Sequence, residues 1–309
     1  IKDEQYLPAF YEGTKAQLAE VAAIIDAIEP TTFENTIVAL EKSGQILGRA
    51  LNVFYNKSSS DTSDLIDEIE AEIAPKLAAH SDAIQLNPKL FAKVKSLYEN
   101  RSSLNLNSED SWLLEKYYRD LVHAGAHLSE AERVQLTGIN EELSKLQTAF
   151  GKNLLNDTND LGVLVENLVD LDGLTATEIA TASNAAKDRG HEGKYLLAMV
   201  NFTGNPILTT LKNRELRKKI MDASLVKGNR NNEKDTKALL LQMVKLRARR
   251  AKLFGVSSHA EYVIHEQTAG SPANVHKVLR EKDACALGDM NFMSPRCLQK
   301  QLESRCHQQ

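Results

Sequence analysis

The sequence predicts an all-α protein with at most a small two-stranded β ribbon. Apolar residues recur at the spacing of an amphipathic helix over most of the chain, and four Ser/Thr-x-x-Glu pairs mark helix starts, where they satisfy the first backbone donors of a helix. Glycine and proline are few, at 15 and 7 of 309 residues. Because 42% of residues are hydrophobic and 26% charged, the chain is expected to be globular. We expect one continuous helical body over residues 1–280.

The helix starts are the clearest local signals. Thr31-x-x-Glu34 opens an apolar stripe that runs from Thr31 to Tyr55, with Gly44 filling a gap in it. The same pair pattern begins at Ser129, Thr175 and Ser258. The stripe that follows Ser129 is the longest, enough for about seven turns. Four capping boxes therefore predict four helix starts.

The remaining helices are expected from apolar spacing and from proline positions. Their ranges are 3–28, 61–85, 88–100, 108–124, 213–226, 231–254 and 272–279. Pro88 suits a first turn, and Pro75 predicts a kink. Two short segments rich in β-branched or aromatic residues, 161–165 and 195–202, are expected to pair as the ribbon.

Charge and composition exclude several classes of function. A net charge of −4 offers no overall positive field, so nucleic acid is not an expected partner. No apolar run approaches the roughly 20 residues that span a bilayer, so no membrane partner is expected. The first 284 residues contain no cysteine and the chain opens without a leader pattern, which favours the cytoplasm, with the periplasm as the alternative.

The stretch VIHEQTAG, residues 263–270, begins like the H-E-x-x-H helix of zinc proteases. A zinc helix of this type needs a second histidine one turn after the first, and that position is Ala269. One imidazole and one carboxylate do not make a zinc site, so His265 and Glu266 are interpreted as part of a solvated face. His123 and His127 are four residues apart, but the intervening residues indicate a helix end and supply no carboxylate.

Two further groups carry donor atoms or charge. Cys285, Cys297, Cys306 and His307 lack the paired C-x-x-C spacing of zinc sites and are interpreted as free groups in a loose tail. The basic run 245–252 lies at the end of a predicted helix, where cations complement the helix dipole; an anion or peptide-carboxylate contact is the alternative. The residues therefore predict no catalytic and no metal-ligating side chain, and substrate-binding residues stay unknown.

Six longer stretches resemble the thimet oligopeptidase (M3) family of zinc metallopeptidases. They are LPAF (7–10), PTTFENTIVALEKSG (30–44), AGAHLSEAERVQLTGINEELSKLQTAFGKNLLNDTN (124–159), LDGL (171–174), KNRELRKKIMDASLVKGN (212–229) and LRARRAKLFGVSSHAEYV (246–263). The resemblance covers about Asp3 to Leu279. Within the family it is most similar to the bacterial peptidyl-dipeptidase (Dcp) branch, with oligopeptidase A next.

The resemblance implies a fold and an activity. Members of this family are almost entirely helical, with two lobes flanking a deep channel that admits short peptides. Their H-E-x-x-H helix, third zinc ligand and transition-state-stabilising tyrosine and histidine lie in the half that would follow residue 280. The resemblance thus implies an N-terminal lobe without a zinc site, inactive alone, whose full-length counterpart uses Zn²⁺. VIHEQTAG aligns well before the family's zinc helix, so His265 and Glu266 inherit no role.

The resemblance stops after Arg280, where residues 281–309 carry every cysteine of the chain and no long helical stripe. We expect this divergent tail to lie outside the family fold, poorly packed and free of metal, as a truncation with a shifted frame or a misassembled gene would produce. The alternative to a peptidase portion is a non-catalytic helical module. It would bind peptides or a partner, or self-associate, through apolar surface left exposed.

Overall fold

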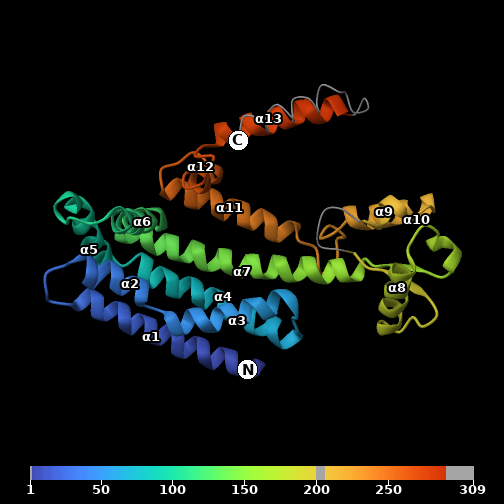
Figure 1. Cartoon of the computed structure of the whole chain (residues 1–309), viewed down its shortest axis with the longest axis horizontal. Helices are drawn as coiled ribbons and strands as arrows, with labels where there is room; N and C mark the ends of the chain where they lie inside the picture. The colour runs from blue at the N-terminus through green and yellow to red at the C-terminus, as the bar shows by residue number, and fades with distance from the viewer. Residues whose placement is uncertain (1, 200–205, 290–309) are drawn as a thin grey trace. The chain divides into compact units, whose positions relative to one another are not determined.

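The protein is all-α with one two-stranded antiparallel sheet, which confirms the predicted fold class (Figure 1). The computed structural model describes residues 2–199 and 206–289, with side chains described as far as Lys282. The described residues form two compact units, one up to Leu246 and one from Arg247. Among the described helices, none combines the length and the apolar composition needed to cross a membrane.

The helices account for most of the described chain. Their bounds are α1 Tyr6–Asp26, α2 Ala39–Lys42, α3 Gln45–Ser60, α4 Asp64–Gln85, α5 Pro88–Glu99, α6 Ser108–Ala124, α7 Glu130–Asp160, α8 Ala176–Asp188, α9 Ile207–Thr210, α10 Arg214–Leu225, α11 Lys237–Leu253, α12 His259–Ile264 and α13 Pro272–Asp289. A π-helical turn, Glu34–Val38, leads into α2. The predicted ribbon is confirmed: β1 (Val163–Val165) pairs with β2 (Tyr195–Leu197), with Leu164 opposite Leu196.

Three of the four predicted helix starts are capped at the expected serine or threonine. At α7 the Ser129 hydroxyl accepts a hydrogen bond from the Glu132 N–H, and the Glu132 carboxylate accepts one from the Ser129 N–H at 2.9 Å. Thr175 makes the same reciprocal pair at α8. At α12 only half of the box forms, because the Glu261 carboxylate accepts from the Ser257 N–H instead.

The fourth predicted cap was wrong by one residue. Thr32 and Asn35 form the reciprocal pair, at 2.8 Å from the Thr32 N–H to Asn35 Oδ1 and 3.1 Å from the Asn35 N–H to Thr32 Oγ1. Tertiary packing explains the shift. Phe33 and Ile37 are buried, 4% and 0% exposed, and their places in the core fix the register of the turn.

The predicted continuous helix from Thr31 to Tyr55 is interrupted at Gly44. Gly44 has a φ of +71°, a left-handed conformation that ends α2 and starts α3. Its N–H donates to the Glu20 carboxylate at 2.7 Å, and a Cβ at this position would lie 2.3 Å from Gln17 Nε2. The interruption therefore lets α1 approach the turn closely. By contrast, α4 continues through Pro75.

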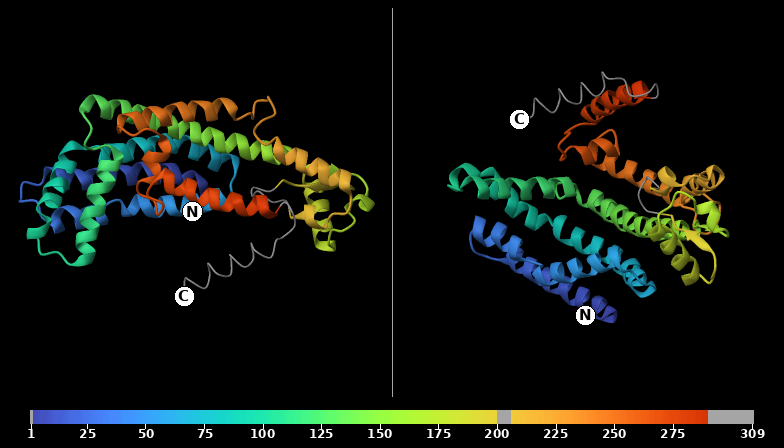
Figure 2. Two further views of the ribbon diagram at one scale, coloured as in Figure 1. Left: turned by 90° about the horizontal axis from the view of Figure 1, so that it is seen from above. Right: turned by 45° about the vertical axis from the view of Figure 1, so that its right-hand side comes forward.

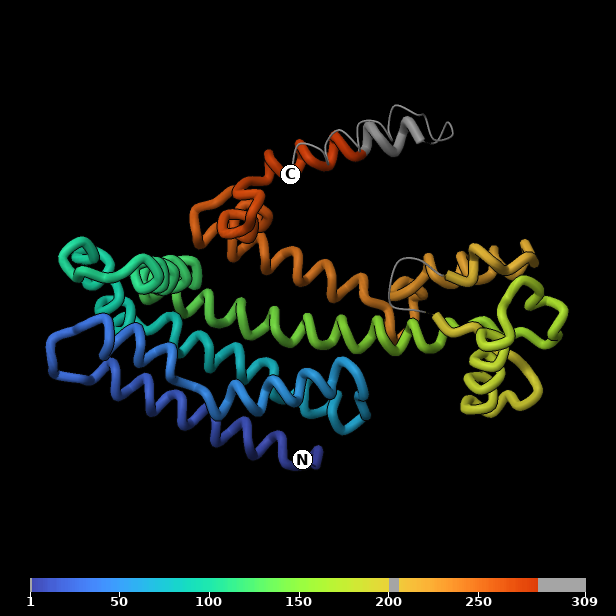
Figure 3. Tube along the Cα trace, in the orientation of Figure 1, coloured from blue at the N-terminus to red at the C-terminus, as the bar shows by residue number. Residues whose placement is uncertain are grey.

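The cores of the first unit lie between layered helices. In the tube and in the turned views, α1 runs beside α3 and α4 beside the long α7 (Figures 2 and 3). One core is built on Phe10 and Phe54, whose rings meet edge to face with centroids 5.2 Å apart. A second core joins α1, α5 and α6, and a third lies under the β ribbon with α8 and α10. The third core sits at the C-terminal end of α7 (Figure 1).

In the second unit, α13 extends further than predicted. The expected helix 272–279 continues to Asp289, so the predicted boundary at residue 280 falls inside α13. Its sequence past Leu279 consists largely of good helix formers, which explains the continuation. Residues 290–309, with Cys297, Cys306 and His307, lie outside the described residues, so the predicted packing of the tail stays a prediction.

Candidate functional site: the polar cluster at the end of α7

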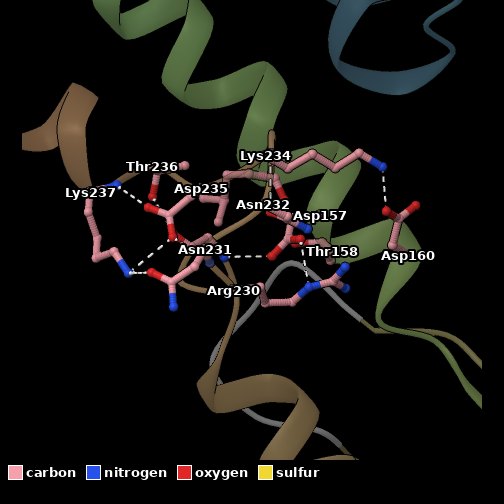
Figure 4. Close-up of polar contacts among 12 residues, drawn as sticks. Asp157, Thr158, Asp160, Arg230, Asn231, Asn232, Lys234, Asp235, Thr236 and Lys237 are labelled. Carbon is pink, nitrogen blue, oxygen red and sulfur yellow. Dashed lines mark hydrogen bonds and ion pairs between the residues drawn. The ribbon is translucent and has the colours of Figure 1, made fainter.

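A buried carboxylate near the C-terminal end of α7 holds the loop between α10 and α11 (Figure 4). Asp157 is fully buried, and its Oδ2 accepts a hydrogen bond from the Gly228 N–H at 2.7 Å. Its Oδ1 lies 3.3 Å from Nε of Arg230, so the carboxylate and the guanidinium form an ion pair. A carboxylate excluded from water is strongly destabilising unless it is paired and hydrogen-bonded. These two partners therefore fix where the loop crosses α7.

The loop itself closes around an ammonium group (Figure 4). Lys237 Nζ donates to Oδ1 of Asn229 and of Asn231, each at 2.7 Å, and lies 3.1 Å from Asp235 Oδ2. Backbone N–H groups of Lys237 and Asn231 donate to the Asp235 carboxylate and lower its pKa below the usual value. Three side chains of the loop thus contact the Lys237 ammonium group on one side, while the Lys237 side chain stays about half exposed. These contacts tie the loop to α7 and to the first residue of α11.

This loop corrects the predicted helix 231–254, because α11 begins only at Lys237. The Thr236 N–H and hydroxyl both bond to the Gly228 carbonyl, at 2.9 and 3.0 Å. Gly228 has a φ of +67°, and a Cβ there would lie 2.6 Å from Thr236 Oγ1. Lys234 also donates to Asp160 on α7. These tertiary bonds compete with helix formation over residues 231–236.

Neither His265 with Glu266 nor His123 with His127 lies as a pair on one helix. His265 and Glu266 are exposed and lie in the turn that follows α12, so the one-turn spacing of a zinc helix does not apply to them. His123 lies in the last turn of α6 and His127 beyond it, because Gly125, with a φ of +109°, ends the helix between them. The predicted helix end is confirmed.

The basic run 245–252 lies in the C-terminal half of α11, as predicted. Within the second unit, the Arg250 guanidinium sits 5.0 Å from the centre of the Tyr262 ring, a cation–π contact. His259 stacks on the same ring, and burial together with nearby Arg250 and Arg247 lowers its pKa. Arg250 is thus engaged in packing, which favours the structural interpretation for this residue.

A zinc site needs three or four nitrogen, sulfur or oxygen ligands from the protein. Among residues described by the structure, no three His, Cys, Asp or Glu side chains gather closely enough to hold a metal ion. The side chain of Cys285 is not among those described, and Cys297, Cys306 and His307 fall beyond residue 289. The donor set of the described part therefore does not fit a zinc centre.

Asp157 was missed by sequence reasoning. It is one of several acidic residues near the end of α7, and no local signal separates it from Asp160. The loop was detectable in principle, because the run KGNRNNEKDT (227–236) is rich in turn-forming glycine, asparagine and aspartate. The apolar spacing that follows it dominated the helix prediction instead.

Comparisons with known proteins agree with the resemblance seen in the sequence. Residues 207–287 match the model of the family described as Peptidase family M3. The "Dipeptidyl carboxypeptidase" of Escherichia coli is 34% identical over 281 residues, which cover 91% of this chain and 41% of that protein. The protein of the same name from Salmonella typhimurium is 33% identical over 272 residues, covering 88% of this chain and 40% of that protein. "Probable cytosolic oligopeptidase A" of Arabidopsis thaliana is 25% identical over 259 residues, covering 81% and 37%.

The chain spans about two fifths of the length of the dipeptidyl carboxypeptidases that it matches. The family match begins at α9 and ends within α13, while the pairwise matches extend over nearly the whole chain. By these sequence relationships, residues 207–287 match peptidase family M3, and the chain as a whole is similar to dipeptidyl carboxypeptidases.

Proposed function

We propose that this chain is the N-terminal portion of a zinc-dependent peptidyl-dipeptidase, which as a whole releases dipeptides from the carboxyl ends of short peptides. The observation that carries the proposal is the 34% identity to a dipeptidyl carboxypeptidase over 91% of this chain. In such an enzyme Zn²⁺ activates the water that attacks the peptide bond. Because the described donors do not fit zinc, the proposal places the ligands and the general base in the part of the relatives that this chain does not span.

On this proposal, the described residues contribute architecture rather than chemistry. Asp157 and Arg230 hold the α10–α11 loop on α7, and that loop sets the start of α11. Helices α9 to α12 and most of α13 lie in the segment that matches the family model. The N-terminal helices would thereby position the segment that leads into the catalytic part.

The test uses two proteins. The first is the purified 309-residue chain, and the second is the chain fused, at the end of its matched region, to the rest of the E. coli dipeptidyl carboxypeptidase. With a short unstructured peptide and added Zn²⁺, we expect dipeptide release by the fusion alone, and we expect a chelator to abolish it. Chelator-sensitive cleavage by the 309-residue chain would refute the placement of the zinc ligands. A folded fusion that cleaves no peptide would refute the proposed activity.

A second candidate function, a non-catalytic helical module that binds another polypeptide, is favoured by one observation. Large apolar side chains are exposed on α10 and α11, among them Leu225 at 72% and Leu241 at 55%. Exposed apolar surface of this kind marks association sites. Sedimentation of the purified chain tests it: a monomer at all concentrations that binds neither peptide nor protein would count against the module.

A further inference from the structure

Helix α11 presents large apolar side chains on more than one side. Six of the ten residues from 237 to 246 are Leu, Met or Val. Of these only Met243 is buried, at 4% exposed, while Leu240, Leu241 and Val244 are 48%, 55% and 52% exposed. A helix that is apolar around most of its circumference is normally covered by neighbours on several sides. The described residues cover only the side of α11 that carries Met243.

The three exposed side chains form a single surface, called here the α11 apolar face. Leu240, Val244 and Leu241 fall within an arc of about 100° on the helix. Lys245 follows Leu241 by one turn and is exposed beside the face. The loop before α11 is tied to Asp157 on α7, which anchors the segment that leads into this face. Preformed apolar surface flanked by a cation fits a partner with apolar residues and a nearby carboxylate.

Charge argues against a second copy of this chain as the occupant. Helix α11 carries six basic residues and no acidic one, in the sequence KALLLQMVKLRARRAKL. A symmetric dimer built on this helix would bring two basic helices together. Like charges facing each other across an interface oppose association.

The part of the relatives' length that this chain does not span is the other candidate occupant of the α11 apolar face. All of α11 lies within residues 207–287, which match the family model, and this chain spans only 41% of the E. coli dipeptidyl carboxypeptidase. We propose that the α11 apolar face is the docking surface for the rest of the peptidase, the three fifths of the relatives' length that this chain does not span. The inference rests on the proposed function, since it takes that missing part as the partner.

Thiol labelling tests the proposal on the full chain and on the fusion described above. The native cysteines are replaced by serine, and one new cysteine is introduced as Leu241→Cys, or as Val134→Cys for the control. Val134 is 69% exposed on α7. In the chain alone, both cysteines should react with a maleimide at similar rates at every protein concentration. In the fusion, labelling at position 241 should slow by at least about tenfold while position 134 is unchanged.

Two results overturn the proposal. Equal labelling of position 241 in the chain and in the fusion would leave the face uncovered by the rest of the enzyme. Protection of position 241 in the chain alone that rises with protein concentration would assign the face to a second copy. Peptide cleavage is read separately: a fusion that protects position 241 but cleaves nothing refutes the proposed activity and keeps the docking surface.

A second measurement tests the same docking surface without the fusion, in case the fusion fails to fold. The rest of the E. coli enzyme, tagged and co-expressed as a separate polypeptide, should retain the 309-residue chain on an affinity column. It should lose the triple variant Leu240→Ser, Leu241→Ser, Val244→Ser while retaining Val134→Ser. Retention of the triple variant, or no retention of the unsubstituted chain, contradicts the proposal.

Discussion

The helices before residue 200 and the segment 207–287 use their apolar residues differently. Phe10, Phe54 and Ile66 in the first region are completely buried within that region's own helices. In the second region, α12 has no buried residue, and the apolar face of α11 is about half exposed. The family model matches the second region and not the first. The difference teaches that the first region buries its largest apolar side chains among its own helices, whereas the second buries Leu216 and Ile220 in the core shared with the β ribbon and leaves the α11 apolar face about half exposed.

The largest expected effect is a core truncation in the first region. Phe54→Ala removes a buried ring that contacts Tyr6 and Phe10 edge to face, and it should lower the free energy of unfolding by about 3–5 kcal/mol. Leu241→Ala on α11 should change it by less than about 0.5 kcal/mol, because the side chain is half exposed. Urea unfolding followed by circular dichroism measures both. Similar losses for the two variants would break the contrast between the regions.

The next largest effect is expected at Asp157, which connects α7 of the first region to the α10–α11 loop of the second. Asp157→Ala leaves the Gly228 N–H without its acceptor and the Arg230 guanidinium without its ion-pair partner, and it should lower the free energy of unfolding by about 1.5–3 kcal/mol. The matched control is Asp160→Ala, which breaks the partly exposed pair with Lys234 and should cost at most about 1 kcal/mol. Hydrogen exchange of the amides from Gly228 to Thr236 should quicken only in the first variant. Equal exchange in both would show that the buried carboxylate does not hold the loop.

A smaller effect tests the register of the cap before α2. Thr32→Ala removes the hydroxyl that accepts from the Asn35 N–H and should cost about 1 kcal/mol. Thr31→Ala should change the free energy of unfolding by less than about 0.5 kcal/mol, although the sequence pattern predicts Thr31 as the cap. Thermal unfolding of the two variants decides between the registers. A larger loss at Thr31 would restore the sequence-based register.

The smallest expected effect is a pH dependence from His80 in the first region. His80 Nε2 lies 2.7 Å from Gln17 Oε1, and burial lowers the pKa of His80 below its usual 6.5. The unfolded chain therefore binds the proton more readily, so stability should be highest above pH 6.5 and should fall as the pH drops below that value toward the folded pKa. The urea midpoint measured from pH 7.5 to 5.5 should fall less in His80→Gln. If the urea midpoint of His80→Gln falls as steeply with pH as that of the unsubstituted chain, His80 is not the source of the pH dependence.

Helix periodicity, capping pairs and the low content of glycine and proline predicted the fold class and most elements of this protein. The capping boxes at Ser129 and Thr175 and the helix end at Gly125 were confirmed because local hydrogen bonds and backbone conformation decide them. The antiparallel ribbon was also predicted correctly from short β-branched segments. The family resemblance agrees with the comparisons because it rests on long ordered stretches, not on one short motif.

Tertiary structure decided the features in which distant residues compete with local preference. The cap before α2 lies at Thr32, one residue after the predicted position, where Phe33 and Ile37 are buried in the core. At the turn that separates α2 from α3, the Gly44 N–H donates to Glu20 on α1. Asp157 holds a loop 71 residues away in the chain where periodicity had predicted helix. The sequence by itself thus determined which segments form helices, because that depends on neighbours three and four residues apart. Only the folded chain decided where several of them begin and which carboxylate is buried, because those depend on contacts between segments far apart in sequence.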